Sequence, residues 1–181
     1  RSAESTQDKY MGNITNGADL YDFEGYKIYR ATDFEFNDAY NITDGDGNPT
    51  FLEPYVQNGV RAQWDLVDGK SGWHPVDLNG IKFYLGDDTG LTHSYVDHNV
   101  VNGQRYYYAV VSYDYGGDLS NNIIPSDSPM KLRVNPLTGA VSLGPNVVEV
   151  VPSPPSAGFV DASFAGDQVD HVLVHRAERS F

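Results

Sequence analysis

Three oxygen-bearing side chains fall within five positions of the segment NITDGDGNPTFLEP. Asp44, Asp46 and Asn48 alternate with two glycines, so a tight turn would bring their oxygens together. Carboxylate and amide oxygens are the ligands that Ca²⁺ prefers in proteins. The pattern therefore predicts either a calcium site, which Asp38 and Glu53 would complete, or a solvated Asp-Gly turn.

The spacing differs from that of an EF-hand calcium loop. That loop needs glycine at its sixth position and a bidentate acid at its twelfth. Counted from Asp44, these positions hold Pro49 and Tyr55, and Glu53 falls at the tenth. A calcium ion bound here would stiffen a long loop, so its role would be structural.

No other group of residues in the sequence favours catalysis. The chain has no cysteine, which excludes disulfides, thiolate catalysis and cysteine-ligated metal sites. Neither the G-x-S-x-G nucleophile motif nor a phosphate-binding G-x-x-x-x-G-K loop occurs. His171 and His175 share one face of an alternating segment but lack a third zinc ligand nearby. We therefore expect a protein that is not an enzyme.

The composition is typical of an acidic all-β protein. The net charge of −13 argues against nucleic acid and anionic membranes as partners, because both attract clustered Lys and Arg. No apolar run is long enough to span a membrane. Turn-forming residues and tyrosine are abundant, with 18 Gly and 13 Tyr, and hydrophobic residues at 40% are sufficient for a core.

The chain divides into four segments. Residues 1–20 are polar and rich in turn formers, and we expect a loop or the remnant of an early strand there. Residues 21–150 contain period-2 strand patterns, the strongest at YDFEGYKIYRATD and RYYYAVVSYDY. Residues 151–166 are rich in proline and predict an extended linker. Residues 167–181 carry one alternating strand without a partner, which suits the start of another domain.

Two blocks, GYKIYR and YVDHNVVNGQRYYYAVVSYDYGG, resemble the fibronectin type III superfamily in the divergent form common in secreted and cell-surface proteins of bacteria. The resemblance implies an all-β, immunoglobulin-like β-sandwich with a long insertion at residues 33–79 and an extended C-terminal tail. The strands that should precede GYKIYR are not evident, so a sheet edge would stay open for another segment or chain. The matching residues are Gly25, Tyr26, Ile28, Tyr29 and Arg30, then Tyr95, Asp97, Val100, Gly103, Tyr106, Tyr108, Val110 and Asp114, then Gly117, Ser120, Pro125 and Ser126.

Four of these residues are expected to define the fold, namely Tyr26, Gly103, Tyr106 and Tyr108. Tyr106 follows Val100 by six residues, and Gly103 turns the chain between them. Tyr106 resembles the tyrosine of the tyrosine corner, whose hydroxyl group ties the crossover to the backbone. From Tyr106, period-2 alternation places Tyr108 on the same face of the strand.

The resemblance implies a non-catalytic structural or protein-interaction module of an extracellular, cell-surface or periplasmic protein. Its partners would be other proteins or other domains of a larger surface protein. A second hypothesis is a carbohydrate-binding module, in which Trp64 or Trp73 stacks on a polysaccharide, although core packing is the commoner role of such residues. A third is a strand-donating subunit of a surface filament or envelope complex, which the tail strand and the open edge favour.

Overall fold

The predicted all-β fold is confirmed. The computed structural model describes residues 3–14, 21–39, 41–117, 119–120, 122–130 and 132–155, and regular structure in these residues is almost entirely strand. No helix in these residues is long and apolar enough to cross a membrane. The predicted tail strand at 167–181, with its two histidines, and most of the predicted linker lie outside the described residues.

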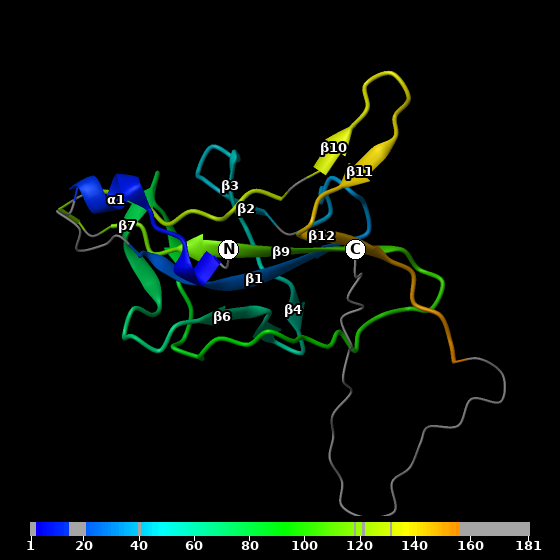
Figure 1. Cartoon of the computed structure of the whole chain (residues 1–181), viewed down its shortest axis with the longest axis horizontal. Coiled ribbons are helices and arrows are strands. Elements are labelled where there is room, and N and C mark those ends of the chain that lie inside the picture. Colours follow the sequence, from blue (N-terminus) through cyan, green and yellow to red (C-terminus); the bar gives the residue numbers. More distant parts are fainter. Residues whose placement is uncertain are drawn as a thin grey trace, which may run out of the picture.

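A four-stranded antiparallel sheet runs through the centre of the molecule (Figure 1). In spatial order its strands are β12 (Val147–Val150), β9 (Tyr106–Asp114), β1 (Phe23–Ala31) and β6 (Gln63–Asp65). The two long central strands, β1 and β9, are rich in tyrosine and β-branched residues, which favour extended backbone. They pair over most of their length.

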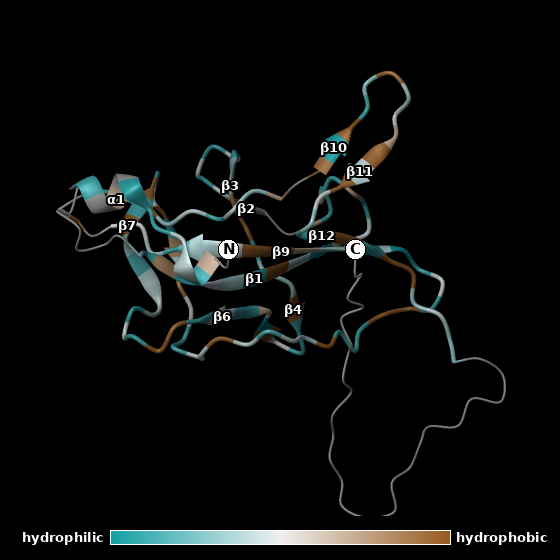
Figure 2. Cartoon of the chain, in the orientation of Figure 1, coloured by the Kyte–Doolittle hydropathy of each residue, from teal (hydrophilic) through white to brown (hydrophobic). Residues whose placement is uncertain are grey.

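The inner face of this sheet carries the main hydrophobic core. Tyr29 of β1 and Tyr107, Ala109 and Val111 of β9 are buried on it. Burial of one large apolar side chain stabilises the folded state by about 1.5–3 kcal/mol. Hydrophobic residues follow β9 and β12 through the centre, whereas β6 is polar (Figure 2). The partly buried residues that pack against this core are Phe34, Leu52, Met130, Leu132 and Leu143.

Four two-stranded hairpins surround the sheet. Two of them turn at Asn58-Gly59 and Asn79-Gly80, where both residues have positive φ, as the tight turn of a two-residue hairpin requires. The last hairpin projects away from the body of the molecule (Figure 1). The hairpins are β2 (Asn41–Thr43) with β3 (Pro49–Leu52), β4 (Val56–Gln57) with β5 (Val60–Arg61), β7 (Trp73–Leu78) with β8 (Ile81–Tyr84), and β10 (Leu132–Val134) with β11 (Val141–Leu143).

The fibronectin-like sandwich stays a prediction. The described residues contain one sheet of more than two strands, and hairpins and loops pack against its inner face where a sandwich has a second sheet. The predicted insertion at 33–79 supplies the β2–β3 and β4–β5 hairpins and strand β7. It also supplies β6, which is the edge strand of the central sheet.

The N-terminal segment differs from the expected loop or remnant strand. It forms a short 3₁₀ turn, η1 (Ala3–Ser5), and a six-residue helix, α1 (Lys9–Ile14). The Asp8 carboxylate accepts a hydrogen bond from the Met11 backbone N–H at 2.9 Å, which caps the helix. The Met11 side chain is buried, so this end of the chain is anchored to the domain.

Candidate functional site

The outer face of the central sheet carries an apolar groove with a volume of about 670 Å³. Strands β1, β6, β9 and β12 form its floor, and the irregular segment 92–100 forms one wall. Its lining residues are Tyr26, Ile28, Trp64, Thr92, His93, Ser94, Tyr95, Val96, Asp97, Val100, Tyr108, Val110, Val150 and Pro152.

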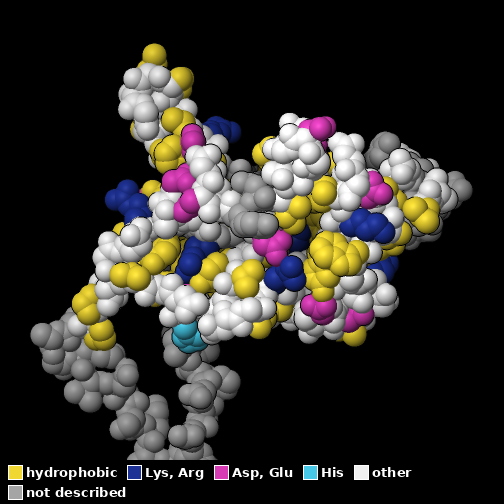
Figure 3. Space-filling model, turned by 180° about the vertical axis from the view of Figure 1, so that it is seen from behind, with side chains coloured by type: hydrophobic (Ala, Val, Ile, Leu, Met, Phe, Trp, Pro, Cys, Tyr) yellow, Lys and Arg dark blue, Asp and Glu magenta, His cyan; other side chains and the backbone are white. Residues whose placement is uncertain are grey.

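The groove exists because the central strands are apolar on both faces. On β1 and β9 the residues that alternate with the inner core point outward, and Ile28 lies directly opposite Val110. The side chains of Val110 and Val148 remain 47% and 52% exposed. On the side of the molecule seen in Figure 3, hydrophobic side chains likewise reach the surface between acidic and basic ones. Exposed apolar residues that share one sheet face are a feature of interaction sites.

The wall of the groove is held in place by side-chain contacts, since residues 92–100 form no strand. The Gln57 side chain donates a hydrogen bond to the Val96 carbonyl and accepts one from the His98 N–H. The Tyr95 ring packs edge-on against Trp64, with 5.5 Å between ring centroids. Burial raises the pKa of Tyr95 to about 12, and its buried hydroxyl has no hydrogen-bond partner among the described residues.

Asp97 makes one end of the groove polar and rigid. Its carboxylate accepts hydrogen bonds from Arg30 Nη1 at 2.8 Å, the Tyr108 hydroxyl at 2.8 Å and the Tyr55 hydroxyl at 3.2 Å. Burial opposes its ionisation, but the bonds from Tyr108, Asn99 and Arg30 hold the pKa of Asp97 below its ordinary value. The Arg30 guanidinium also stacks on the Tyr55 ring, 3.8 Å from its centroid. The charges of Arg30 and Asp97 offset one another at this end, and the rest of the groove is mainly apolar.

A smaller polar contact lies at Tyr26. The Glu4 carboxylate accepts a hydrogen bond from the Tyr26 hydroxyl at 2.9 Å and lies 3.1 Å from His93 Nε2. The bonds to His93 and Tyr26 lower the pKa of Glu4. The N-terminal segment therefore contacts two residues that line the groove.

The two tryptophans predicted as sugar platforms lie in different places. Trp64 lines the groove and is paired across the sheet with Tyr26. Trp73 lies on β7, is 58% exposed, and packs edge-on against Tyr84 with 5.0 Å between ring centroids. Trp73 is not among the residues that line the groove, so the two rings do not form one platform there.

The predicted calcium ligands lie at the turn between β2 and β3, where Asp44 makes contacts within the turn. Its carboxylate accepts hydrogen bonds from the N–H groups of Asp46 at 3.0 Å and Asn48 at 2.9 Å, as in a solvated Asp-Gly turn. Glu53 instead pairs with Arg61 at 2.7 Å. Asp38, the further candidate, accepts hydrogen bonds from Thr32. Across the described ranges, no three His, Asp or Glu side chains form a group that could hold a metal ion.

Tyr106 and Gly103, two of the residues expected to define the fold, anchor the loop that precedes β9. The Tyr106 hydroxyl accepts a hydrogen bond from the Val101 N–H, five residues upstream, at 3.0 Å. This is the type of contact that the fibronectin resemblance implies for Tyr106. Gly103 has a φ of 83° and donates its N–H to the Pro152 carbonyl, which fixes the chain after β12 beside the groove.

Sequence reasoning did not identify the groove. Its signal is present in RYYYAVVSYDY, where apolar residues occupy both faces of one strand, as expected for a strand covered on both sides. No sequence pattern indicates that Tyr95, Val150 and Pro152 line the groove, because the loop and the strand that carry them meet only in the tertiary fold.

No protein-family model matches the chain, and no curated protein or solved structure is significantly similar to it.

Proposed function

We propose that the chain is a non-catalytic interaction module of an extracellular or cell-envelope protein, and that the groove binds an extended segment of a partner protein. The single observation that carries this proposal is the apolar groove on the outer face of the central sheet. Its one carboxylate, Asp97, is already bonded to Arg30, so the groove offers mainly apolar contact. Such a surface selects a partner by shape and apolar area.

An extended polypeptide suits this site because the groove reaches an edge of the sheet. Within the described chain β12 pairs only with β9, so its other edge is open to a further strand. A segment added at that edge would form backbone hydrogen bonds with β12. Its alternate side chains would then lie beside Val148 and Val150 on the outer face.

A carbohydrate ligand is the second candidate, and the exposed ring of Trp73 favours it. Its site would lie on the β7–β8 hairpin, apart from the groove. Loss of glycan-array binding in Trp73→Ala would support this function. Glycan binding that is unchanged in both Trp73→Ala and Trp64→Ala would rule it out. The strand-donating hypothesis depends on residues 167–181, which lie outside the described residues.

A displayed random-peptide selection tests the proposed function. We expect enrichment of extended peptides with alternating apolar residues that bind the wild-type chain. Val110→Glu should weaken their binding at least tenfold, about 1.4 kcal/mol, because it places a charge on the groove floor. Val134→Glu is the matched control, since Val134 is 45% exposed on a strand outside the groove. Peptides that bind Val110→Glu as tightly as wild type would contradict the proposal.

A further inference from the structure

Lys27 is an unusual residue because its whole side chain is inside the protein. It lies on the inner face of β1 and is 3% exposed. Its Nζ lies 3.6 Å from the centroid of the Phe83 ring and 4.7 Å from that of Tyr113. Lysine is almost never fully buried unless it is paired. Aromatic rings surround the Nζ atom, so the reactivity of the amine depends on its polar partner in the described part of the chain.

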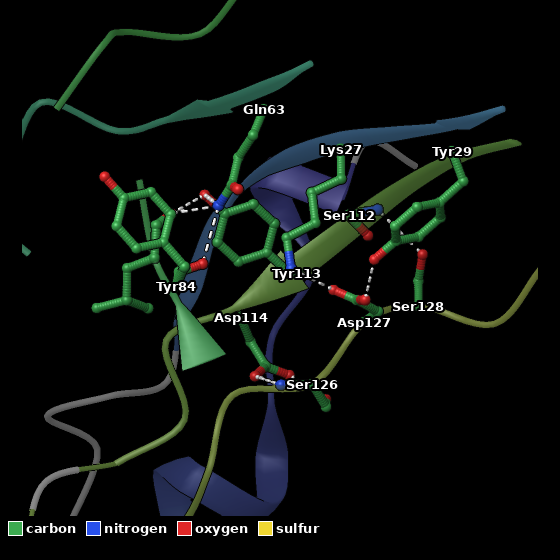
Figure 4. Close-up of polar contacts among 11 residues, drawn as sticks. Lys27, Tyr29, Gln63, Tyr84, Ser112, Tyr113, Asp114, Ser126, Asp127 and Ser128 are labelled. Atoms are coloured by element: carbon green, nitrogen blue, oxygen red, sulfur yellow. Dashed lines mark hydrogen bonds and ion pairs between the residues drawn. The ribbon is translucent and has the colours of Figure 1, made fainter. Parts of the chain in front are cut away.

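That partner is Asp127, which lies in the chain segment after β9. Its Oδ1 lies 3.2 Å from Lys27 Nζ, and its Oδ2 accepts a hydrogen bond from the Tyr29 hydroxyl at 2.5 Å. A backbone bridge between Tyr113 and Asp127 fixes the segment against the sheet. Figure 4 shows the Lys27 and Tyr29 side chains converging on the Asp127 carboxyl group from the same strand.

We infer that Lys27 and Asp127 form a covalent cross-linking site, in which Lys27 Nζ condenses with the Asp127 carboxyl group to give a side-chain amide and one water molecule. Three structural features favour it: a buried amine, a carboxyl group at contact distance, and a hydroxyl already bonded to the second carboxyl oxygen. This inference does not depend on the groove or on the proposed function.

The condensation starts with a proton transfer. A proton moves from the Lys27 ammonium group to the Asp127 carboxylate and gives a neutral amine and a neutral carboxylic acid. Burial favours the neutral amine of Lys27 because moving a charge out of water is costly. Burial also lowers the pKa of Lys27 to about 8, although the charge of Asp127 opposes this, so the nucleophilic amine is accessible near neutral pH.

The amide then forms by addition and elimination. The Nζ lone pair attacks Asp127 Cγ and the C=O electron pair moves onto Oδ2, where the Tyr29 hydroxyl can stabilise the developing negative charge. The Cγ–Oδ1 bond breaks, Oδ1 leaves with its own proton and one from Nζ, and the C=O bond reforms. The products are one amide and one water, with no change of oxidation state. Burial raises the pKa of Tyr29, so its hydroxyl keeps its proton and remains a donor.

The cross-link would join two parts of the domain that are 100 residues apart in the sequence. A covalent closure of this kind lowers the conformational freedom of the unfolded chain, as a disulfide does. A chain without cysteine has no disulfide with which to do so. Held at contact distance, the two groups also react as if at very high concentration.

Intact-mass measurement of the denatured full chain tests the inference. We expect the wild-type chain to be lighter than its sequence by one water molecule, and the Lys27→Arg and Asp127→Ala variants to have their full mass. Aspartates before glycine, such as Asp44 and Asp46, can also lose water by forming a succinimide with the backbone. Protease mapping of the wild-type chain must therefore show one peptide pair joined through Lys27 and Asp127.

A wild-type chain at full mass, after prolonged incubation in the folded state, would overturn the inference. So would a peptide map of the wild-type chain that lacks the pair joined through Lys27 and Asp127, because succinimide formation at Asp44 or Asp46 can account for a lost water on its own. The map uses the wild-type chain alone, so it decides the question even where either variant fails to fold.

Discussion

Replacement of Glu24 by glutamine should stabilise the folded chain, and more strongly as the pH rises. Both Glu24 carboxyl oxygens are buried without a hydrogen-bond partner in the described part of the chain. Burial, reinforced by the negative charges of Asp68, Asp65 and Asp88 and opposed by Lys70, raises the pKa of Glu24 to about 8. The folded state therefore keeps Glu24 protonated at pH values where the unfolded chain has lost that proton.

The direction and size of the effect follow from this difference in proton binding. Between the ordinary pKa of 4.5 and about 8 the folded state holds one proton more than the unfolded state, so stability falls as the pH rises. The free energy of unfolding is lower by about 3 kcal/mol at pH 7 than at low pH because of this group. The decrease continues up to about pH 8 and then levels off. Glutamine has the same shape but no charge, so Glu24→Gln should remove this pH-dependent loss.

Denaturant unfolding of wild type and Glu24→Gln at pH 5, 7 and 9 measures the effect. The free energy of unfolding of Glu24→Gln, relative to that of wild type, should increase by about 2.5 kcal/mol between pH 5 and pH 7. Glu35→Gln is the matched control, because it makes the same substitution at an exposed position. An advantage of Glu24→Gln that is equal at all three pH values would refute the reasoning, since Glu24 would then ionise normally in the folded chain.

Three further changes test the structure elsewhere. Gly25→Ala should destabilise the fold by about 2 kcal/mol or more in thermal unfolding, because its Cβ would lie 2.2 Å from the Trp64 carbonyl oxygen. Tyr106→Phe should lower the free energy of unfolding by about 1 kcal/mol, because the Val101 N–H loses its acceptor, and an unchanged denaturation midpoint would contradict this. Ca²⁺ should raise the melting temperature relative to chelator if the turn at Asp44 binds it, and equal melting curves would exclude this calcium site.

The central sheet could be predicted from the sequence because its signal is local. In RYYYAVVSYDY and YDFEGYKIYRATD, period-2 alternation identifies β9 and β1 and separates their two faces correctly. The helix at the N-terminus was missed because six residues are too few to show a helical period. Asp8, three residues before Met11, was the one capping signal for it.

The sites could be predicted only in part because they depend on distant segments. Trp64 was selected as an aromatic residue and does line the groove, but the wall around Tyr95 has no periodicity that would place it there. The contact between Lys27 and Asp127 joins residues 100 positions apart, and no local pattern marks it. The buried carboxyl group of Glu24 likewise looks in sequence like any other acid beside a glycine.

Methyl NMR during titration with a selected peptide tests most directly whether the outer face is the binding surface. The methyl signals of Ile28, Val110 and Val148 should shift, because these residues lie on or beside the groove floor. The signal of Val111, which is buried on the inner face, should remain in place. Shifts confined to the projecting hairpin around Val134, with the outer face unchanged, would contradict the proposed function.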